Sequence, residues 1–203
     1  MTNNIPVMID LVFDVDGSTL PVAHPFALWT ALLLHAPQLE EEKLIGTLPL
    51  RATENNQGML LSKRAKLALR LPTTLAVSVT SSLTGQLLDM NGSAIRLGAA
   101  KTRPIQPFPT IHAQMVTGAT DEVLFVNDIN MQLKELGISG KLICGKRHTL
   151  TSKQHHIHGF SLVIHDLKPE ASLKLQYAGL GGSRRFGCGI FIPYKVISGL
   201  SDD

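Results

Sequence analysis

The segment from Gly179 to Gly189 combines glycines and arginines in an arrangement that suits the binding of a phosphate or of a guanine edge. Two Gly-apolar-Gly triplets enclose five residues, which are Gly182, Ser183, Arg184, Arg185 and Phe186. Glycines let a phosphate approach main-chain N–H groups closely, and arginines add permanent charge and forked donors. A glycine-rich turn between a helix and a strand is the alternative interpretation.

Residues 155 to 158 include three histidines, so zinc binding has to be considered there. If this segment is a strand, His156 and His158 share one face and form a pair that can bind zinc. No carboxylate or third ligand is evident nearby, and no metal site is predicted. A basic hairpin running from Lys146 and Arg147 through Lys153 to His158 is favoured, with a plain solvated hairpin as the alternative.

Positive charge is concentrated in the C-terminal part of the chain. Residues 141 to 195 contain nine Lys or Arg against two Asp or Glu, whereas residues 1 to 60 contain two against seven. Five of the eight histidines also fall in the basic segment, so its positive charge grows as the pH falls. A polyanion is the expected partner of this half.

The composition, with 44% hydrophobic and 17% charged residues in a chain of 203, is that of a globular protein. No apolar run approaches the roughly 20 residues that span a bilayer, and residues 1 to 6 show no secretory signal. We therefore expect a cytoplasmic protein without a membrane partner. Cys144 and Cys188 fit neither a disulfide framework nor a C-x-x-C site, and both are predicted to be small apolar residues in strands.

A mixture of strands and helices must position these residues. In the N-terminal half, alternating apolar residues predict a strand over residues 5 to 15. Pro25 then starts a helix whose predicted apolar face carries Phe26, Trp29, Thr30, Leu33 and Leu34. The remaining predicted elements are two strands of one hairpin at 59 to 61 and 66 to 71, a helix at 73 to 84, and a strand at 94 to 99.

The C-terminal half repeats this order. It consists of a strand at 111 to 116, a helix at 121 to 136 capped by Thr120 and ended at Gly137, strands at 147 to 151 and 160 to 164, a helix at 169 to 177, and a strand at 188 to 194. Two β-α-β-β-α-β units predict an α+β fold of tandem ferredoxin-like modules. The modules are placed at residues 1–102 and 110–203, with a proline-containing linker at 103–109.

The glycine-rich segment also resembles the loop of the RAMP superfamily of CRISPR RNA-binding proteins, whose members are built from ferredoxin-like modules. Its continuation, Ile-Phe-Ile-Pro-Tyr-Lys at 190 to 195, looks like the closing strand of the repeat-processing endoribonucleases in that superfamily. Residues 20 to 28, 67 to 72 and 95 to 98 resemble the same family.

This resemblance implies an enzyme that binds CRISPR repeat RNA, cleaves precursor crRNA and joins the other subunits of an effector complex. A related subunit that holds guide RNA without cutting it is the first alternative. A ferredoxin-like regulator that binds a small ligand is the second, although such a ligand would not require the charge of residues 141 to 195.

The resemblance also implies cleavage without a metal or other cofactor. The ribose 2′-hydroxyl would attack the neighbouring phosphate, leaving a 2′,3′-cyclic phosphate and a 5′-hydroxyl. Such a reaction needs a base, an acid and cationic groups. His24 matches the family's histidine segment and stands at the start of the predicted helix, where the helix end attracts phosphate and disfavours a protonated imidazole. It is the first candidate for the base, with helix capping as the alternative.

The other site residues are candidates because of their position and charge. His35, at the far end of the helix, is a second catalytic candidate, with a surface residue as the favoured alternative. In the turn of the predicted hairpin, Ser62 could orient the phosphate, and Lys63 and Arg64 could stabilise its charge, with a plain exposed basic turn as the alternative. Contacts to RNA are expected from Arg64, Lys146, Arg147, Lys153, His155, Gly181, Gly182, Ser183, Arg184 and Arg185.

Overall fold

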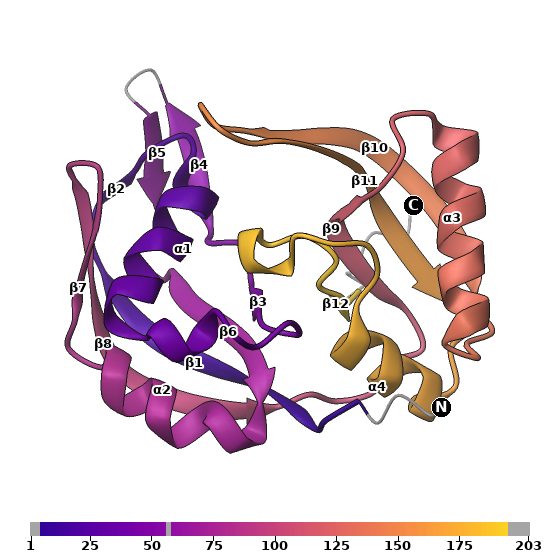
Figure 1. The fold of residues 1–203 in the computed structure, drawn as a ribbon, viewed down its shortest axis with the longest axis horizontal. Helices are drawn as coiled ribbons and strands as arrows, with labels where there is room; N and C mark the ends of the chain where they lie inside the picture. Colours follow the sequence, from indigo (N-terminus) through magenta and orange to yellow (C-terminus); the bar gives the residue numbers. More distant parts are fainter. Residues whose placement is uncertain (1–4, 56–57, 195–203) are drawn as a thin grey trace, which may run out of the picture.

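The computed structural model describes residues 5–55 and 58–194, which form two modules that lie side by side (Figure 1). The elements of the N-terminal module are β1 (Met8–Asp16), β2 (Thr19–Leu20), α1 (His24–His35), η1 (Pro37–Leu39), β3 (Gly46–Thr47), β4 (Ala52–Asn55), β5 (Gly58–Leu61), β6 (Lys66–Pro72), η2 (Thr73–Leu75), α2 (Ala76–Leu83), β7 (Leu87–Met90) and β8 (Ser93–Pro104). Those of the C-terminal module are β9 (Ile111–Thr117), α3 (Glu122–Glu135), β10 (Lys141–Thr151), β11 (His156–His165), α4 (Pro169–Ala178), η3 (Arg184–Phe186) and β12 (Ile192–Pro193).

Each module has the strand order of a ferredoxin-like fold. The larger N-terminal sheet has the order β3-β6-β1-β8-β7, and the C-terminal sheet has the order β10-β11-β9-β12. In each sheet the first strand of the module lies in the interior, β1 between β6 and β8 and β9 between β11 and β12, as in a ferredoxin-like fold. Every pairing within these two sheets is antiparallel. The predicted tandem ferredoxin-like fold is confirmed. A third, small sheet of order β2-β5-β4 is an addition to the N-terminal module.

The apolar face of α1 differs from the predicted one. Thr30 is exposed and Leu34 is 78% exposed, whereas Leu28, Ala31 and Leu32 are buried against the N-terminal sheet. Phe26 and Trp29 are buried, as the sequence predicts. The buried face of the helix therefore includes part of the predicted face but is centred on a different side of the helix.

Strand β6 is buried on both faces and does not pair with the segment 59–61, so the predicted hairpin is wrong. Leu67, Leu69 and Leu71 fill the core of the N-terminal module, as their alternation predicts. Ala68 and Arg70 are buried as well, because the opposite face of β6 meets the C-terminal module. Within its sheet, β6 pairs with β1 on one side and with β3 on the other. The segment 59–61 pairs instead with β2 and β4.

Several predicted boundaries also shift. Strand β8 continues to Pro104, two residues into the predicted linker, because it pairs with β1 along its length. The carboxylate of Asp121, and not Thr120, caps α3 by accepting a hydrogen bond from the Leu124 N–H. The last predicted strand shrinks to β12, because Gly187 and Gly189 adopt positive φ values of 92° and 66° that interrupt an extended chain. Lys195 lies outside the described residues.

No helix of the described ranges is long and apolar enough to cross a membrane.

The two modules are joined by a buried guanidinium. Arg70, which is 1% exposed, donates hydrogen bonds at 2.7 and 3.1 Å to the carboxylate of Asp10 on β1. Its Nη1 also donates across the module boundary to the carbonyl oxygens of Phe191, at 2.6 Å, and Gln176, at 3.2 Å. Arg103 donates to Asp10 from the solvent side at 3.0 Å. The charge of Arg70 is thereby balanced by one carboxylate, while its remaining donors fix the C-terminal module.

Removing the Arg70 side chain should destabilise the whole protein. The Arg70→Ala variant leaves Asp10 buried with only Arg103 as a partner, and two carbonyls of the C-terminal module lose their donor. We expect the free energy of unfolding to fall by about 3–5 kcal/mol in urea titrations. Lys66→Ala, which removes the exposed ion pair with Asp14, is the matched control and should change the free energy of unfolding far less. Equal losses in the two variants would contradict this role of Arg70.

Candidate functional site

A cleft of about 660 Å³ lies between the two modules. One wall comes from the N-terminal module and consists of the start of α1, the segment 47–50 and residues of the small sheet. The other wall comes from the face of the C-terminal sheet that its helices leave uncovered, together with the residues that follow η3. The polar and aromatic side chains of the lining include His24, Thr47, His112, Gln114, His148, Ser161, Phe186 and Tyr194.

The interior of this cleft carries little charge. Its described lining residues include three histidines, and no Asp, Glu, Lys or Arg is among them. Most of the others are apolar, and the remaining polar groups are hydroxyls and one amide. A site of this kind favours neutral imidazoles and strengthens any hydrogen bond formed inside it, because water is partly excluded.

His24 occupies the first position of α1 and faces the cleft. Its Nδ1 atom is buried and has no hydrogen-bond partner among the described residues. Burial lowers the pKa of His24 below its usual value of 6.5, and the neighbouring backbone of Pro21 and Val22 opposes this effect only in part. The imidazole is therefore neutral at pH 7 and able to accept a proton, which is the state that the sequence predicts for a base at a helix start.

His112 and His148 bring two further imidazoles to the opposite wall. Burial lowers the pKa of His112, and neither of its ring nitrogens has a hydrogen-bond partner among the described residues. The ring of Tyr194 meets the His112 ring edge-on, with 5.4 Å between centroids. His148 stands on β10 and is exposed. No chemical role was predicted for either histidine. Alternation along β9 could have identified His112, since Ile111 and Ala113 fill the core and His112 therefore lies on the open face of the sheet.

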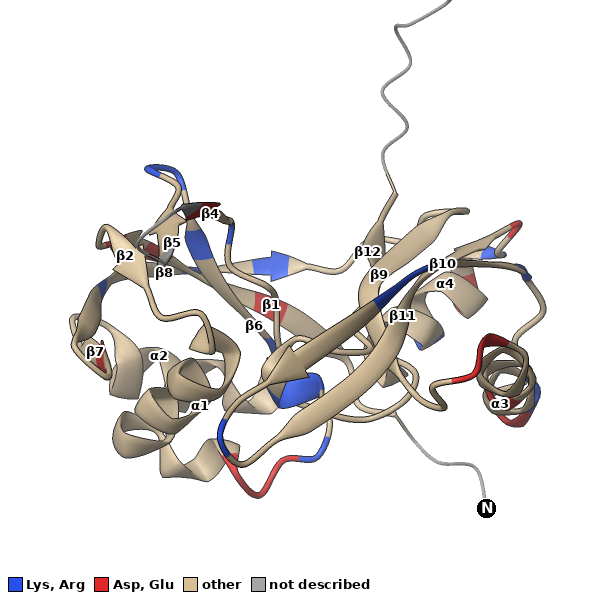
Figure 2. Cartoon of the chain, turned by 90° about the horizontal axis from the view of Figure 1, so that it is seen from above, with Lys and Arg blue, Asp and Glu red and all other residues tan. Residues whose placement is uncertain are grey.

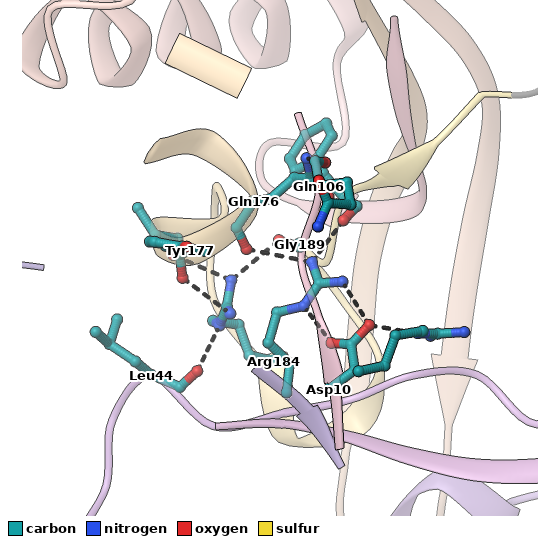
Figure 3. Close-up of polar contacts among 11 residues, drawn as sticks. Asp10, Leu44, Gln106, Gln176, Tyr177, Arg184 and Gly189 are labelled. Atoms are coloured by element: carbon teal, nitrogen blue, oxygen red, sulfur yellow. Dashed lines mark hydrogen bonds and ion pairs between the residues drawn. The ribbon is translucent and has the colours of Figure 1, made fainter. Parts of the chain in front are cut away.

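The glycine-rich loop is folded around Arg184 (Figure 3), which corrects the prediction that this side chain contacts RNA. Arg184 is 7% exposed. Its guanidinium donates to the carbonyl oxygens of Tyr177, Ala178 and Gly189 at 3.2, 3.0 and 3.3 Å, and to that of Leu44 in the other module at 3.1 Å. Burial and the nearby charge of Arg70 lower the pKa of Arg184 to about 10, so it remains charged at neutral pH.

The glycines of the loop serve this arrangement. Gly179 has a φ of 69°, and a Cβ there would overlap the Arg184 guanidinium and the carbonyl of Gly189. The Gly181 N–H donates to the side chain of Gln132 at 2.9 Å, and the Gly182 N–H donates to the Thr117 hydroxyl at 2.6 Å. The predicted main-chain cradle for a phosphate at these two glycines is therefore wrong, because both N–H groups already have partners.

A model of the family described as Cas6 Crispr matches residues 9–196 of the chain. A curated relative, the CRISPR-associated endonuclease Cas6 of Myxococcus xanthus (strain DK1622), is 35% identical over 192 residues, which cover 94% of this chain and 83% of the relative. The chain belongs to the Cas6 family. The resemblance of its sequence to the repeat-processing endoribonucleases is thereby confirmed.

Solved structures of Cas6 and related proteins share the fold. A CRISPR associated protein Cas6 matches with a TM-score of 0.69 at 10% identity, covering 93% of this chain and 100% of that one. A Cas6-related protein from Pyrococcus furiosus matches with a TM-score of 0.68 at 11% identity, over 91% and 98% of the two chains. Cse3 of Thermus thermophilus, bound to an RNA that represents a pre-cleavage complex, has a TM-score of 0.53 at 14% identity, over 92% and 98%.

The other predicted catalytic residues of this Cas6-family chain do not join His24 in the cleft. His35 stands at the opposite end of α1, roughly 16 Å away at the rise of 1.5 Å per residue. Ser62 and Lys63 are exposed in the turn between β5 and β6, as is Arg64, and none of the three lines the cleft.

Lys and Arg residues are distributed over both modules (Figure 2), and those predicted to contact RNA are all exposed except Arg184. Lys146 and Arg147 are exposed on β10, and Lys153 is exposed in the turn between β10 and β11. Arg185 is exposed beside the cleft residue Phe186, and its guanidinium carbon lies 5.7 Å from the centre of the Trp29 ring. Arg64 completes the set in the β5–β6 turn. Ser183 is partly exposed, with a φ of 60°.

The β10–β11 hairpin reaches from its own module to α1. His155 stacks on Phe26 of α1, with 4.9 Å between ring centroids and 15° between planes. His156 and His158 share a face, as their alternation predicts, with ring centroids 4.5 Å apart. No group of three metal-binding side chains occurs among residues 5–55 and 58–194.

The two cysteines are both protonated thiols, and one of them, Cys188, lines the cleft. Cys144 is on β10, whereas Cys188 lies in the irregular segment before β12 and not in a strand. Burial raises the pKa of both thiols, that of Cys188 to about 11, so both stay protonated at neutral pH.

Arg184 and Arg185 should behave differently although they are adjacent in sequence. The Arg184→Lys variant keeps the charge, but one ammonium group cannot donate to four carbonyls that surround a planar guanidinium. We expect its free energy of unfolding to fall by about 2–4 kcal/mol in urea titrations. Arg185→Lys, the matched control at an exposed position, should leave it nearly unchanged. An unaltered stability of Arg184→Lys would show that the carbonyl contacts contribute little.

Proposed function

We propose that this chain is a metal-independent endoribonuclease that binds CRISPR repeat RNA and cuts precursor crRNA at the cleft between its modules. Membership of the Cas6 family supports the activity, and the curated relative carries the name of an endonuclease. The observation that carries the proposal is the position of His24, a neutral imidazole at a helix start within an inter-module cleft. Association of the processed RNA and protein with other subunits of an effector complex is part of the same proposal.

In the proposed reaction, His24 takes the proton from a ribose 2′-hydroxyl. The 2′ oxygen forms a bond to the adjacent phosphorus, and the bond from phosphorus to the 5′ oxygen breaks. The departing oxygen needs a proton, for which the exposed His148 on the opposite wall is the candidate donor. The products are a 2′,3′-cyclic phosphate and a 5′-hydroxyl. No step requires a metal ion or another cofactor.

The exposed cations would hold the RNA backbone outside the neutral cleft. Arg185 is exposed beside Trp29 of α1. Arg147 on β10 pairs with the core residue Phe160, so by strand alternation its side chain projects from the face of the sheet opposite the cleft. Both arginines are proposed to contact the RNA backbone away from the opening. Lys146 on β10, and Lys153 and His155 in the turn between β10 and β11, are proposed to extend this RNA-contacting surface. Ser62, Lys63 and Arg64 lie outside the cleft and are proposed to contact RNA beyond the cut.

Replacing His24 should remove most of the activity. We expect His24→Ala to slow cleavage of a repeat RNA about a hundredfold or more, since a positioned base contributes at least that factor. The measurement is a single-turnover rate with mapping of the cut and the end groups, in buffer with EDTA. His35→Ala, at the opposite end of α1, is the comparison that decides between the two candidates.

The pH profile has a predicted direction. Because the pKa of His24 is lowered below 6.5, the neutral form predominates at pH 7, and the rate should fall only as the pH drops through that lowered pKa.

Binding without cutting in the wild type would favour a non-catalytic RNA-binding subunit. Loss of cutting in EDTA would contradict metal independence.

Salt dependence should report the phosphate contacts. The logarithm of the RNA association constant should fall linearly with the logarithm of salt concentration, because each neutralised phosphate releases counterions. Arg147→Ala and Arg185→Ala should each reduce the magnitude of this slope by about one. Arg96→Ala is a control, since Arg96 is bonded to the Gly85 carbonyl on the far edge of the N-terminal sheet. Unchanged slopes in both variants would contradict the assignment.

A further inference from the structure

Buried polar atoms without partners are concentrated in one place. Among the described residues, such side-chain atoms are Nδ1 of His24, Oγ1 of Thr47, and both ring nitrogens of His112. All three residues line the inter-module cleft. His24 and Thr47 belong to one wall, and His112 belongs to the other.

This concentration has an energetic meaning. A buried polar atom without a hydrogen bond destabilises the folded state, so native proteins contain few of them, and each requires an explanation. Thr47 lies on β3 in register with Leu69, so a valine there would fit the strand without an unpaired hydroxyl. His112 lies on β9 in register with Ile192 and Val163, where an apolar side chain would suit the fold equally well. The polar atoms at these positions therefore point to a ligand.

The character of the cleft selects the class of ligand. A phosphate would need cations, and the described lining contains no Lys or Arg. A nucleobase is flat, uncharged and mostly apolar on its faces, and its edge carries both donors and acceptors. Histidine presents both kinds of group, and threonine does so through one hydroxyl. The volume of about 660 Å³ lies within the usual range for small-ligand sites.

We propose that the cleft is a nucleobase pocket, in which Thr47 and His112 contact the edge of one unstacked base of the RNA, that of a nucleotide flanking the cleaved phosphate. This inference rests on the proposed endoribonuclease function. The scissile phosphate lies next to His24, the other phosphates stay outside the cleft, and the captured base sets the position of the ribose. Thr47 and His112 are thus specificity-determining residues for the choice of the cut.

The test combines two shape-conserving variants with RNA that lacks single bases. Thr47→Val and His112→Phe remove the unpaired polar atoms while keeping the approximate shape. Both should fold with unchanged or raised Tm, because no hydrogen bond among the described residues is lost. Thr80→Val, in α2 and outside the cleft, is the matched control. Each protein is assayed for cleavage of repeat RNAs with an abasic site at one nucleotide at a time, and for binding of the same RNAs with a 2′-deoxyribose at the cut.

In the wild type and in Thr80→Val, one abasic site next to the cut should reduce the cleavage rate and the affinity by about tenfold or more. In Thr47→Val and His112→Phe, intact RNA should already show a loss of this order, and removing that base should cost little more. A penalty for the abasic site that is the same in all four proteins overturns the proposal. So does the absence of any sensitive nucleotide beside the cut.

Failure of the nuclease proposal would look different. If the wild type binds RNA but does not cut it, the affinities for the 2′-deoxy RNAs still report the base pocket. A sensitive nucleotide whose penalty disappears in Thr47→Val and His112→Phe would then support the pocket and refute only the chemistry.

Discussion

The structure depends on two arginines that each donate across the boundary between the modules. Arg70 of the N-terminal module donates to Phe191 and Gln176, and Arg184 of the C-terminal module donates to Leu44. A buried guanidinium is tolerated only when nearly all of its donors have acceptors, so the carbonyls around it must keep fixed positions. Since the acceptors belong to both modules, the two arginines fix the relative orientation of the modules and, with it, the separation of the cleft walls.

The same constraint divides the electrostatic roles in the molecule. Arginines that hold the modules together are buried and unavailable to a ligand, whereas Arg147 and Arg185 are exposed outside the cleft. The described lining of the cleft contains no Asp, Glu, Lys or Arg, and burial lowers the pKa of His24 and His112 and keeps both imidazoles neutral. The cations that would bind a polyanion thus lie outside the cleft, and the neutral imidazoles that could accept a proton lie inside it. This separation keeps the cations from changing the protonation of the imidazoles.

The glycine pattern of the loop indicated the correct family, but the glycines have a different structural role from the predicted one. The pattern of glycines indicated a family whose members bind RNA, and the comparisons confirm the family. The glycines nevertheless do not form a main-chain cradle at Gly181 and Gly182, whose N–H groups bond within the protein. Gly179 makes room for the Arg184 guanidinium. The glycines of this motif therefore serve the packing of the loop, and the adjacent Arg185 is the side chain that is exposed to solvent.

The sequence by itself determined the tandem fold, the positions of the larger helices and strands, the basic C-terminal half and the place of His24 at the start of α1. Each of these follows from alternation, capping or composition within a short segment, where the relevant neighbours are close in sequence. Only the tertiary structure decided that Arg184 is buried, that β5 and β6 belong to different sheets, and that His112 shares a cleft with His24 while His35 does not. These outcomes depend on contacts between segments far apart in the chain, because burial and hydrogen-bond partners are set by whichever distant surface packs against a residue.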